Sequence, residues 1–319
     1  MADTFSEVWR QVKAHVPLAP ALLCQQWVRQ AYNETCRRRP WSWLRSEAEL
    51  IVNAATSGTC NVTRGSATIS GGTLTYPASD VDRQFRVGSS SPVYTIISVN
   101  VGVSYTLDRV YGAATALATG ATVLDAYMTM PADFQRFIAV LDTVNNWQLH
   151  IWMTDDELNT WDPQRSATGT PWALASRRLK TQGTASLIGR AQYELWPYTL
   201  VDKNYPYFYA RQPEALSDDT AFLGVLSTRG DLLLSLALSY AAEWPGTVDQ
   251  RNLYYNAGLS ASKRSQFTSD CDRLEVQDEE MFGTWLESVQ LASRWPYAPF
   301  DSRFGQSHDV SFGGGYSPW

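Results

Sequence analysis

Residues Arg37-Arg38-Arg39-Pro40-Trp41-Ser42-Trp43-Leu44 mark the point where the chain changes from helical to strand patterning. Before this stretch apolar residues recur at helical spacing, and after residue 48 they alternate in short runs. The three arginines complement the negative end of the preceding helix dipole, and Pro40 ends that helix. Trp41, Trp43 and Leu44 follow as a compact aromatic motif. We expect this motif to lock the helix against the strands and against a later helix at residues 229–244.

Residues 1–47 are predicted to form two helices. Thr4 and Glu7 have the spacing of a capping box, and Pro17 stops the first helix, which is predicted over residues 4–16. Pro20 suits the first turn of the second helix, predicted over residues 20–37. Both helices place their apolar residues on one side, as helices that pack into a bundle do.

Residues 48–130 are rich in Gly, Ser and Thr, carry few charges and contain short runs with period two. Turn signals such as Gly71-Gly72 separate these runs at near-regular spacing. Seven runs are predicted to be strands: Glu49–Ala54, Thr59–Thr63, Ala67–Ser70, Gln84–Val87, Val93–Val99, Ser104–Leu107 and Ala121–Thr129. The pattern predicts a small antiparallel β-barrel or sandwich, inserted between the helices.

Residues 131–228 have a mixed pattern. A strand over Gln148–Met153 is followed by Thr154-Asp155-Asp156-Glu157, which has the composition of a helix start. Tyr193–Trp196 and Tyr205–Ala210 then alternate as a hairpin pair. A proline within the second run favours an edge strand there. This part of the chain is therefore predicted to hold short strands and one short helix.

Residues 229–295 are predicted to be helical again. Arg229 to Trp244 carries one apolar face, and Asp249 to about Ser293 contains no proline, so it forms either one long helix or two shorter ones. Residues 296–319 hold three prolines and many Gly and Ser, and they cannot make a core alone. Spaced aromatic residues make this segment an arm suited to another subunit's grooves: Tyr297, Phe300, Phe304, Phe312, Tyr316 and Trp319. The whole pattern predicts an α+β fold, a helical bundle with an inserted small antiparallel β-barrel or sandwich and an extended C-terminal arm.

The composition is that of a globular chain with aromatic interfaces. Thirteen Trp and sixteen Tyr among 319 residues favour such interfaces, because these side chains combine large buried area with a polar handle. A net charge of -6 argues against a protein that grips nucleic acid, which needs a basic stripe. The same charge suits a wall past which DNA slides without being captured.

Cysteine usage and the apolar runs favour synthesis in a cytoplasm. The chain does not start with a basic region followed by an apolar stretch, and its longest apolar run, Leu232–Ala242, is too short to span a bilayer. Cys24, Cys36, Cys60 and Cys271 form no CxxC pair. We expect four reduced cysteines and no membrane contact.

The sequence contains no group of residues typical of a catalytic, metal or cofactor site. His15, His150 and His308 share no metal-ligand spacing. The acids at 155–157 are explained by a first helical turn, where they offset the dipole. The acidic run over residues 270–280 lacks the glycine of a calcium loop and is expected to be a solvated helix face. Neither a phosphate loop nor a nucleophile elbow occurs.

Two further features have both a functional and a structural interpretation. Arg37, Arg38 and Arg39 could contact a DNA phosphate backbone, but they more often complement the helix dipole or pair with a neighbouring subunit's acids. The tryptophans could stack on sugars, yet most stand at helical or strand-core positions, so core packing explains them first.

The order of several short motifs carries a resemblance. The basic stretch ending in Pro40-Trp41-Ser42-Trp43-Leu44 is followed by Met130-Pro131-Ala132-Asp133-Phe134, then Asp155-Asp156-Glu157-Leu158, Tyr193-Glu194-Leu195-Trp196-Pro197 and Tyr205-Pro206-Tyr207-Phe208-Tyr209. In this order, over about residues 18–260, the chain resembles the head-to-tail adaptor, or connector, proteins of tailed bacteriophages. That family includes tail tubular protein A of short-tailed phages and the head completion proteins of long-tailed phages. The glycine-rich module at 48–130 is larger than the loop of minimal members.

The resemblance implies a structural protein of the virion neck, made in the host cytoplasm. It implies a homo-oligomeric ring, twelve subunits in the family, that docks on the portal protein and connects it to a downstream tail or nozzle protein. Double-stranded DNA would pass through this ring without sequence-specific binding. The six arm aromatics would bind the portal, and the β parts would face the tail.

The sequence leaves two alternative functions open. One is a carbohydrate- or receptor-binding phage tail protein that uses exposed tryptophans on the β module. The other is an enzyme that cleaves peptidoglycan, which needs paired carboxylates in a cleft, for example Asp133 with Asp155.

Overall fold

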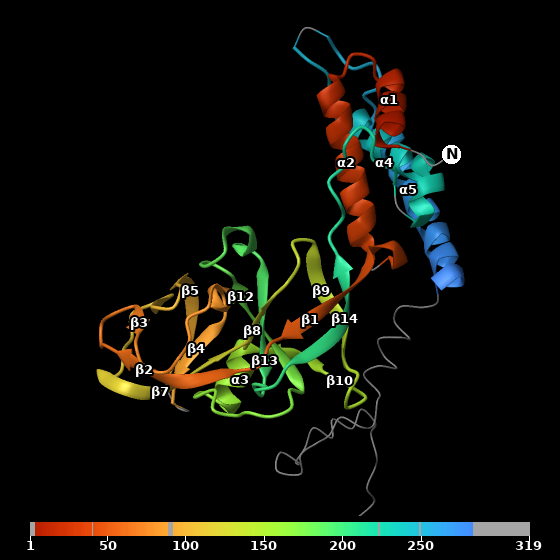
Figure 1. The fold of residues 1–319 in the computed structure, drawn as a ribbon. Helices are drawn as coiled ribbons and strands as arrows, with labels where there is room; N and C mark the ends of the chain where they lie inside the picture. The colour runs from red at the N-terminus through yellow and green to blue at the C-terminus, as the bar shows by residue number, and fades with distance from the viewer. Residues whose placement is uncertain (1–3, 40, 89–91, 223, 249, 283–319) are drawn as a thin grey trace, which may run out of the picture.

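The computed structural model describes residues 4–39, 41–88, 92–222, 224–248 and 250–282, and it is an α+β fold in which a helical bundle stands on a β-rich body (Figure 1). The predicted α+β class is confirmed, as is the barrel alternative for the β module. The arm at 296–319 with its six aromatic residues lies outside the described residues, as does His308.

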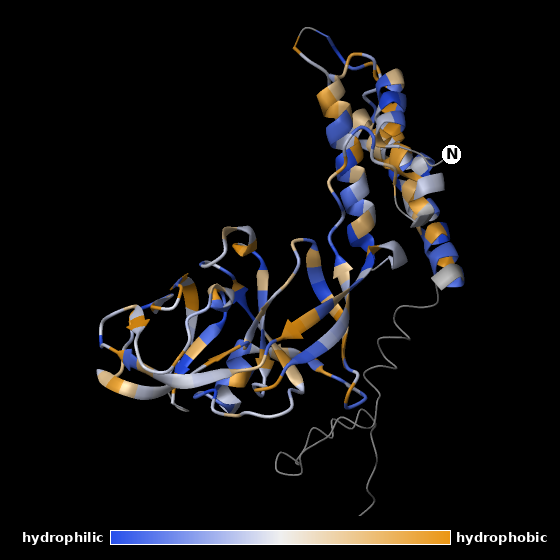
Figure 2. Cartoon of the chain, in the orientation of Figure 1, coloured by the Kyte–Doolittle hydropathy of each residue, from blue (hydrophilic) through white to orange (hydrophobic). Residues whose placement is uncertain are grey.

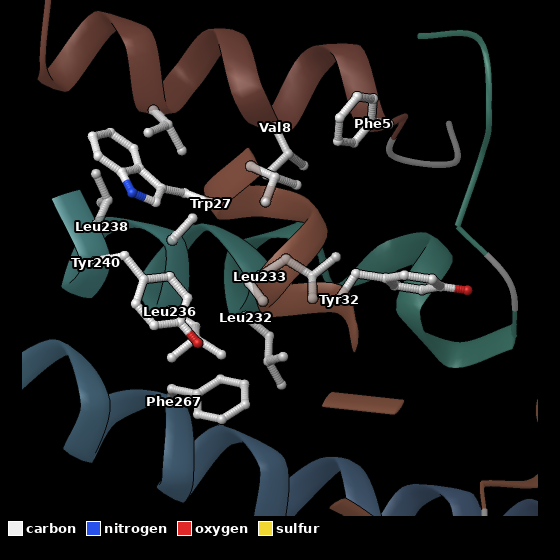
Figure 3. Close-up of a cluster of buried hydrophobic side chains, with 14 of the residues drawn as sticks. Phe5, Val8, Trp27, Tyr32, Leu232, Leu233, Leu236, Leu238, Tyr240 and Phe267 are labelled. Carbon is white, nitrogen blue, oxygen red and sulfur yellow. The ribbon is translucent and has the colours of Figure 1, made fainter. Parts of the chain in front are cut away.

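Four helices make up the bundle: α1 (Phe5–His15), α2 (Ala21–Arg38), α4 (Gly230–Glu243) and α5 (Ala257–Phe282). Helix α4 is apolar on every side and packs against the other three, so it forms the centre of the bundle. Phe5 of α1, Trp27 of α2 and Phe267 of α5 enclose Leu236 and its neighbours on α4 (Figure 3). None of the described helices combines the length and the hydropathy of a membrane-spanning helix.

Local capping signals place two helix starts as predicted. Thr4 accepts a hydrogen bond from the Glu7 backbone and its own N–H donates to the Glu7 carboxylate, which is the expected capping box. Thr154 and Glu157 form the same arrangement at α3 (Asp155–Trp161). Each box satisfies backbone N–H groups that a helix start leaves without partners.

Helix α5 begins at Ala257 and not at Asp249. The connection before it folds back on α4, because the buried Asn252 amide donates to the carbonyls of Ala241 (3.0 Å) and Trp244 (2.7 Å). Helix α5 is a single helix as far as Phe282, and its predicted continuation to Ser293 lies outside the described residues.

Six strands close into an antiparallel barrel in the order β2-β3-β6-β5-β4-β7. Their bounds are β2 Thr56–Val62, β3 Thr68–Ser70, β4 Gln84–Val87, β5 Tyr94–Asn100, β6 Ser104–Leu107 and β7 Ala116–Leu124. The barrel interior is filled by alternate residues, among them Phe85, Ile96 and Tyr105. Closure removes the free sheet edges that short strands would otherwise expose.

The strands of the two remaining sheets precede or follow the barrel strands in the sequence. One has the order β1-β14-β9-β10 and the other β11-β12-β13-β8. Their bounds are β1 Arg45–Val52, β8 Tyr127–Thr129, β9 Phe134–Asp142, β10 Trp147–Gln148, β11 His150–Thr154, β12 Ala173–Leu179, β13 Ala191–Trp196 and β14 Lys203–Arg211. The ranges predicted as the first and last strands of the 48–130 module therefore contribute β1 and β8 to these sheets.

The predicted hairpin between Tyr193–Trp196 and Tyr205–Ala210 is wrong. Strand β13 lies between β12 and β8, whereas β14 lies between β1 and β9 in the other sheet. The connection between them does not form a tight turn, because Leu200 accepts a hydrogen bond from the Ala55 N–H and Asp202 accepts one from the Ala54 N–H. These contacts carry the chain across to the second sheet.

The prediction of an edge strand at Pro206 is also wrong. Pro206 lies opposite Glu49 of β1, while the pairing of β14 with β9 begins only at Tyr207. The proline thus lies beyond the end of the β9 ladder, where a missing N–H removes no bond to that strand.

The single strand predicted over Gln148–Met153 is split between two sheets. The Leu149 N–H donates to Val140 of β9, and the His150 N–H donates to Trp172, next to β12. The chain therefore changes sheets between these two residues, which a continuous alternating pattern does not indicate.

The aromatic motif after α2 lies in the bundle core. Trp41 is fully buried, its indole N–H donates to the Thr35 carbonyl at 2.7 Å, and its ring stacks on Trp43 with centroids 4.6 Å apart. Leu44 belongs to the same buried cluster as α4. The motif therefore joins the base of the bundle to β1, which begins at the next residue.

We predict that Trp41→Ala lowers the free energy of unfolding by about 3–5 kcal/mol, because it leaves a cavity and removes a buried hydrogen bond. Urea denaturation followed by circular dichroism measures the change. Trp43→Ala, at a half-buried position, is expected to cost less. The control is Trp152→Ala, whose side chain is 63% exposed and whose loss is expected to change stability little. A Trp41→Ala protein as stable as this control would contradict the prediction.

Candidate functional site

The predicted basic site at the end of α2 is paired within its own chain. Arg38 forms an ion pair with Asp272 at 3.0 Å, and Arg39 forms ion pairs with Glu275 at 2.6 Å and Glu279 at 3.2 Å. We call these five residues the α2–α5 clasp. The acidic stretch of α5 is thus a partner of α2 along one side, in place of the wholly solvated face that was expected.

Arg37 differs from its two neighbours. It is exposed, and no ion pair joins it to any other residue of the described part of the chain. It lines a groove of about 730 Å³ between α2 and α5, together with Gln26, Asn33 and Phe267. Arg37 is therefore the member of the arginine triplet that remains available for a phosphate or for a neighbouring subunit.

The carboxylates considered for an enzyme have separate partners. Asp133 accepts a hydrogen bond from the Tyr209 hydroxyl at 3.2 Å, whereas Asp155 pairs with Arg165 at 3.0 Å. Within the described ranges, no group of three or more His, Cys, Asp or Glu residues is arranged to hold a metal ion. All four cysteines are buried and form no disulfide, and burial raises the pKa of the Cys36 thiol to about 12.

A buried charge network that the sequence did not indicate connects α3 to β12 and β13. The Glu194 carboxylate is fully buried and accepts from Arg165 at 2.7 Å, from Arg177 at 2.8 Å and from the Tyr198 hydroxyl at 2.6 Å. Arg165 also donates to the carbonyl of Asp162 at 2.7 Å. Because one carboxylate serves two guanidinium groups, three chain segments are held in one geometry.

The loop after α3 is fixed by a second buried acid. Asp162 accepts hydrogen bonds from the N–H groups of Ser166 and Ala167 and from the Trp196 indole at 3.1 Å. Burial alone would raise the pKa of Asp162, but these hydrogen bonds outweigh it and hold the pKa below its usual value. The carboxylate therefore stays ionised at neutral pH and fixes the loop.

A cavity of about 300 Å³ lies between this network and the barrel. Arg109, Arg165 and Arg177 line it, with Tyr127 and Asn159. The Arg177 guanidinium lies 3.7 Å from the centre of the Tyr127 ring, and burial raises the pKa of that phenol to about 12. The three arginines already have partners in Asp108, Asp155 and Glu194. This balance of charge is typical of a structural network.

Exposed tryptophans lie on β11 and on α3. Trp152 of β11 is 63% exposed and Trp161 of α3 is 44% exposed. The Trp161 ring lies 5.9 Å from Trp172, which in turn lies 5.2 Å from the buried Trp196. We call Trp152, Trp161 and Trp172 the tryptophan surface.

The expectation that exposed tryptophans lie on the β module is wrong. Residues 48–130 contain no tryptophan, and the tryptophan surface belongs to β11, α3 and the segment before β12. One signal was present in the sequence. Trp152 alternates with apolar Ile151 and Met153, which places it on the outer face of its strand.

No protein-family model and no curated protein matches this chain.

We predict that Glu194→Gln destabilises the protein by about 3–5 kcal/mol, because it leaves two buried guanidinium groups without a counter-charge. The midpoint of urea denaturation measures the loss. Glu49→Gln is the matched control, since Glu49 is exposed on β1 and its change is expected to be near neutral. Equal midpoints for the two variants would show that the network does not stabilise the sheet.

Proposed function

We propose that this chain is a non-enzymatic structural subunit of a tailed-phage virion, a head-to-tail adaptor that forms a ring between the portal and the tail. The observation that carries the proposal is the architecture of the chain, which has a helical bundle at one end and a rigid β body at the other (Figure 1). Such a shape suits a subunit that contacts different partners above and below. The resemblance of its motifs to the adaptor family supports the same conclusion.

The free end of the bundle has the chemistry of a protein interface. Six large apolar side chains of the described bundle are exposed, and five of them lie in or beside its two end connections: Leu18, Leu22, Val248, Leu253 and Tyr255. The sixth is Val276 on α5. We call the five residues the bundle tip. The two connections lie side by side, because the rings of His15 and Tyr254 are 6.1 Å apart. In Figure 2 this end lies farthest from the sheets.

The bundle tip is also held in place. Besides capping α4 with its side chain, Asn252 donates from its backbone to Pro245 at 3.0 Å and accepts from the Tyr254 N–H at 3.0 Å. Gly246 has a φ of 104°, and a Cβ there would lie 2.4 Å from the Asn252 nitrogen. Exposed apolar side chains next to residues that are fixed in this way are typical of a surface that a partner covers.

The β end has the rigidity that a tail-facing platform needs. Asp125 accepts from Asn53 at 2.8 Å and from Arg83 at 2.7 Å, and Lys180 pairs with Asp82 at 2.7 Å. These contacts join the barrel to the sheets. In the proposed ring this end faces the tail or nozzle protein, and the net charge of -6 lets DNA pass without capture.

A carbohydrate- or receptor-binding tail protein is the second candidate, and the tryptophan surface is the observation that favours it. Exposed indoles stack on the apolar faces of sugar rings. A glycan array probed with the wild-type chain and with Trp152→Ala separates the two. Binding that depends on Trp152, in a chain that forms no ring, would favour this candidate.

We predict that the chain assembles on its portal as a ring of twelve copies. Mass photometry with and without portal measures this, and twelve times 35.7 kDa gives a contribution of about 430 kDa. A chain that lacks residues 296–319 is expected to stay folded and to lose portal binding. A monomeric mass under both conditions, or undiminished portal binding by the shortened chain, would overturn the proposal or the role of the arm, respectively.

We predict that Val248→Ser combined with Leu253→Ser weakens assembly and leaves the melting temperature nearly unchanged. Both side chains are almost fully exposed, so their loss removes apolar contact only with a partner. The control is Val276→Ser, because Val276 is exposed on α5 away from the bundle tip. If the double variant assembles as well as this control, the bundle tip does not contact a partner.

A further inference from the structure

The cavity between the charge network and the barrel has a fourth arginine beside it that no acid matches. Arg109, Arg165 and Arg177 line the cavity and have carboxylate partners. Arg86 of β4 donates to the Arg165 carbonyl at 2.7 Å and is only 5% exposed. Its Nε–H has no acceptor, and it forms no ion pair with any other residue that the structure describes. A buried positive charge of this kind is costly, so the region favours an added anion.

The second buried acid of this region does not neutralise Arg86. The Asp162 carboxylate accepts from the N–H groups of Ser166 and Ala167 and from the Trp196 indole. It forms no ion pair with any of the four arginines, because its oxygens are taken up by the loop that it fixes. The four arginines therefore have only three acids among their direct partners.

Two of the arginines that line the cavity also have unused N–H groups. Arg165 is saturated, because its five N–H groups donate to two carboxylates, one amide oxygen and two backbone carbonyls. Arg177 donates only from Nη1, to Glu194, so its Nε and Nη2 have no acceptor among the described residues. Arg109 donates from its two Nη atoms and not from Nε. A guanidinium edge with two free N–H groups is the geometry that binds an oxyanion.

These unused donors come from three parts of the chain. Arg109 follows β6 of the barrel, Arg177 belongs to β12, and Asn159 belongs to α3. The Asn159 Oδ1 accepts from Arg165 at 2.7 Å, so its amide N–H groups remain as donors. Asp155 also lines the cavity, but its charge is paired with Arg165 at 3.0 Å.

The size of the cavity and the directions of its donors select the ligand. A volume of about 300 Å³ is at the small end of ligand sites, and it excludes a helix or a nucleic-acid duplex. Donors from three elements approach the cavity from separate sides. A tetrahedral phosphate offers oxygens in as many directions, whereas a planar carboxylate offers two oxygens in one plane.

We infer that this cavity binds a phosphate group, held by the free N–H groups of Arg177 and Arg109 and by the Asn159 amide. The site goes beyond the proposed adaptor function and needs neither portal nor ring. The bound phosphate adds negative charge to a group of four arginines with three paired acids. It also joins the barrel to β12 and α3 through one ligand.

Calorimetric titration of the full chain with inorganic phosphate, at constant ionic strength, tests the inference. We expect one phosphate to bind per chain. Arg109→Gln is expected to weaken the Kd about tenfold, because it removes a charge-assisted hydrogen bond, and the fold is expected to persist since this side chain is 49% exposed. The matched control is Arg178→Gln, at the exposed arginine next to Arg177 on β12, which is expected to leave the Kd unchanged.

A second variant supplies the anion covalently. Asn159→Asp keeps an oxygen for Arg165 and places a fixed carboxylate in the cavity, so we expect it to abolish phosphate binding without lowering the melting temperature in chloride. A wild-type chain that binds no phosphate would overturn the inference. So would equal phosphate binding by all the variants, or an equal rise of their melting temperatures, since phosphate also stabilises proteins as a general salt effect. Ring formation on the portal is measured separately, so either proposal can fail alone.

Discussion

Glu194 lies fully buried between Arg165 and Arg177, and this burial constrains the part of the sheet β11-β12-β13-β8 around it. A carboxylate taken out of water is costly unless its charge is matched and its lone pairs are filled. Two guanidinium groups and the Tyr198 hydroxyl fulfil both needs here. Since these partners come from the loop after α3, from β12 and from the segment after β13, none of the three can move without exposing a charge mismatch.

The bundle is organised by a different constraint, the all-round apolar surface of α4. A helix with no polar face has to be covered on every side, and α1, α2 and α5 do so. The coupling between bundle and body is short and stiff. Trp41, Trp43 and Leu44 belong to the bundle core, and β1 begins at Arg45. The bundle therefore fixes the orientation of β1, and with it the sheets, through a few residues and without a flexible linker.

Features that depend on nearby residues could be predicted from the sequence. The capping boxes at Thr4 and Thr154, the strands Gln84–Val87 and Ser104–Leu107, and the α4 helix have signals within a few positions. Which strands pair with one another over long distances in the sequence could not be predicted. The contacts of residues 54 and 55 with the segment after β13 decide which sheet β14 joins, and no local pattern encodes them.

The candidate sites show the same difference between local signals, which the sequence contains, and long-range contacts, which it does not reveal. Arg38 and Arg39 were recognisable as a basic cluster, but their acids lie more than 230 positions away on α5. Glu194 stands in the run Tyr193–Trp196, which alternates like an ordinary strand, so its buried charge had no signature. Trp152 was identifiable as outward-facing from alternation alone, whereas the pairing of its strand with β12 depended on the sheet change at residues 149–150.

The chain enters and leaves the barrel at neighbouring points, because β2 and β7 are paired from Thr56 opposite Val123 onward. An insertion with adjacent ends leaves the host sheets topologically intact, so it can lengthen, shrink or be exchanged through evolution while β1, β8 and their partners keep their register. Arg83 contacts both ends of the insertion, through the Ala54 carbonyl and the Asp125 carboxylate, and Lys180 adds an ion pair to the neighbouring Asp82. The barrel is thus a topologically separate insertion that ion pairs fix to the neighbouring sheets, so its surface can change while the sheets that carry it stay the same.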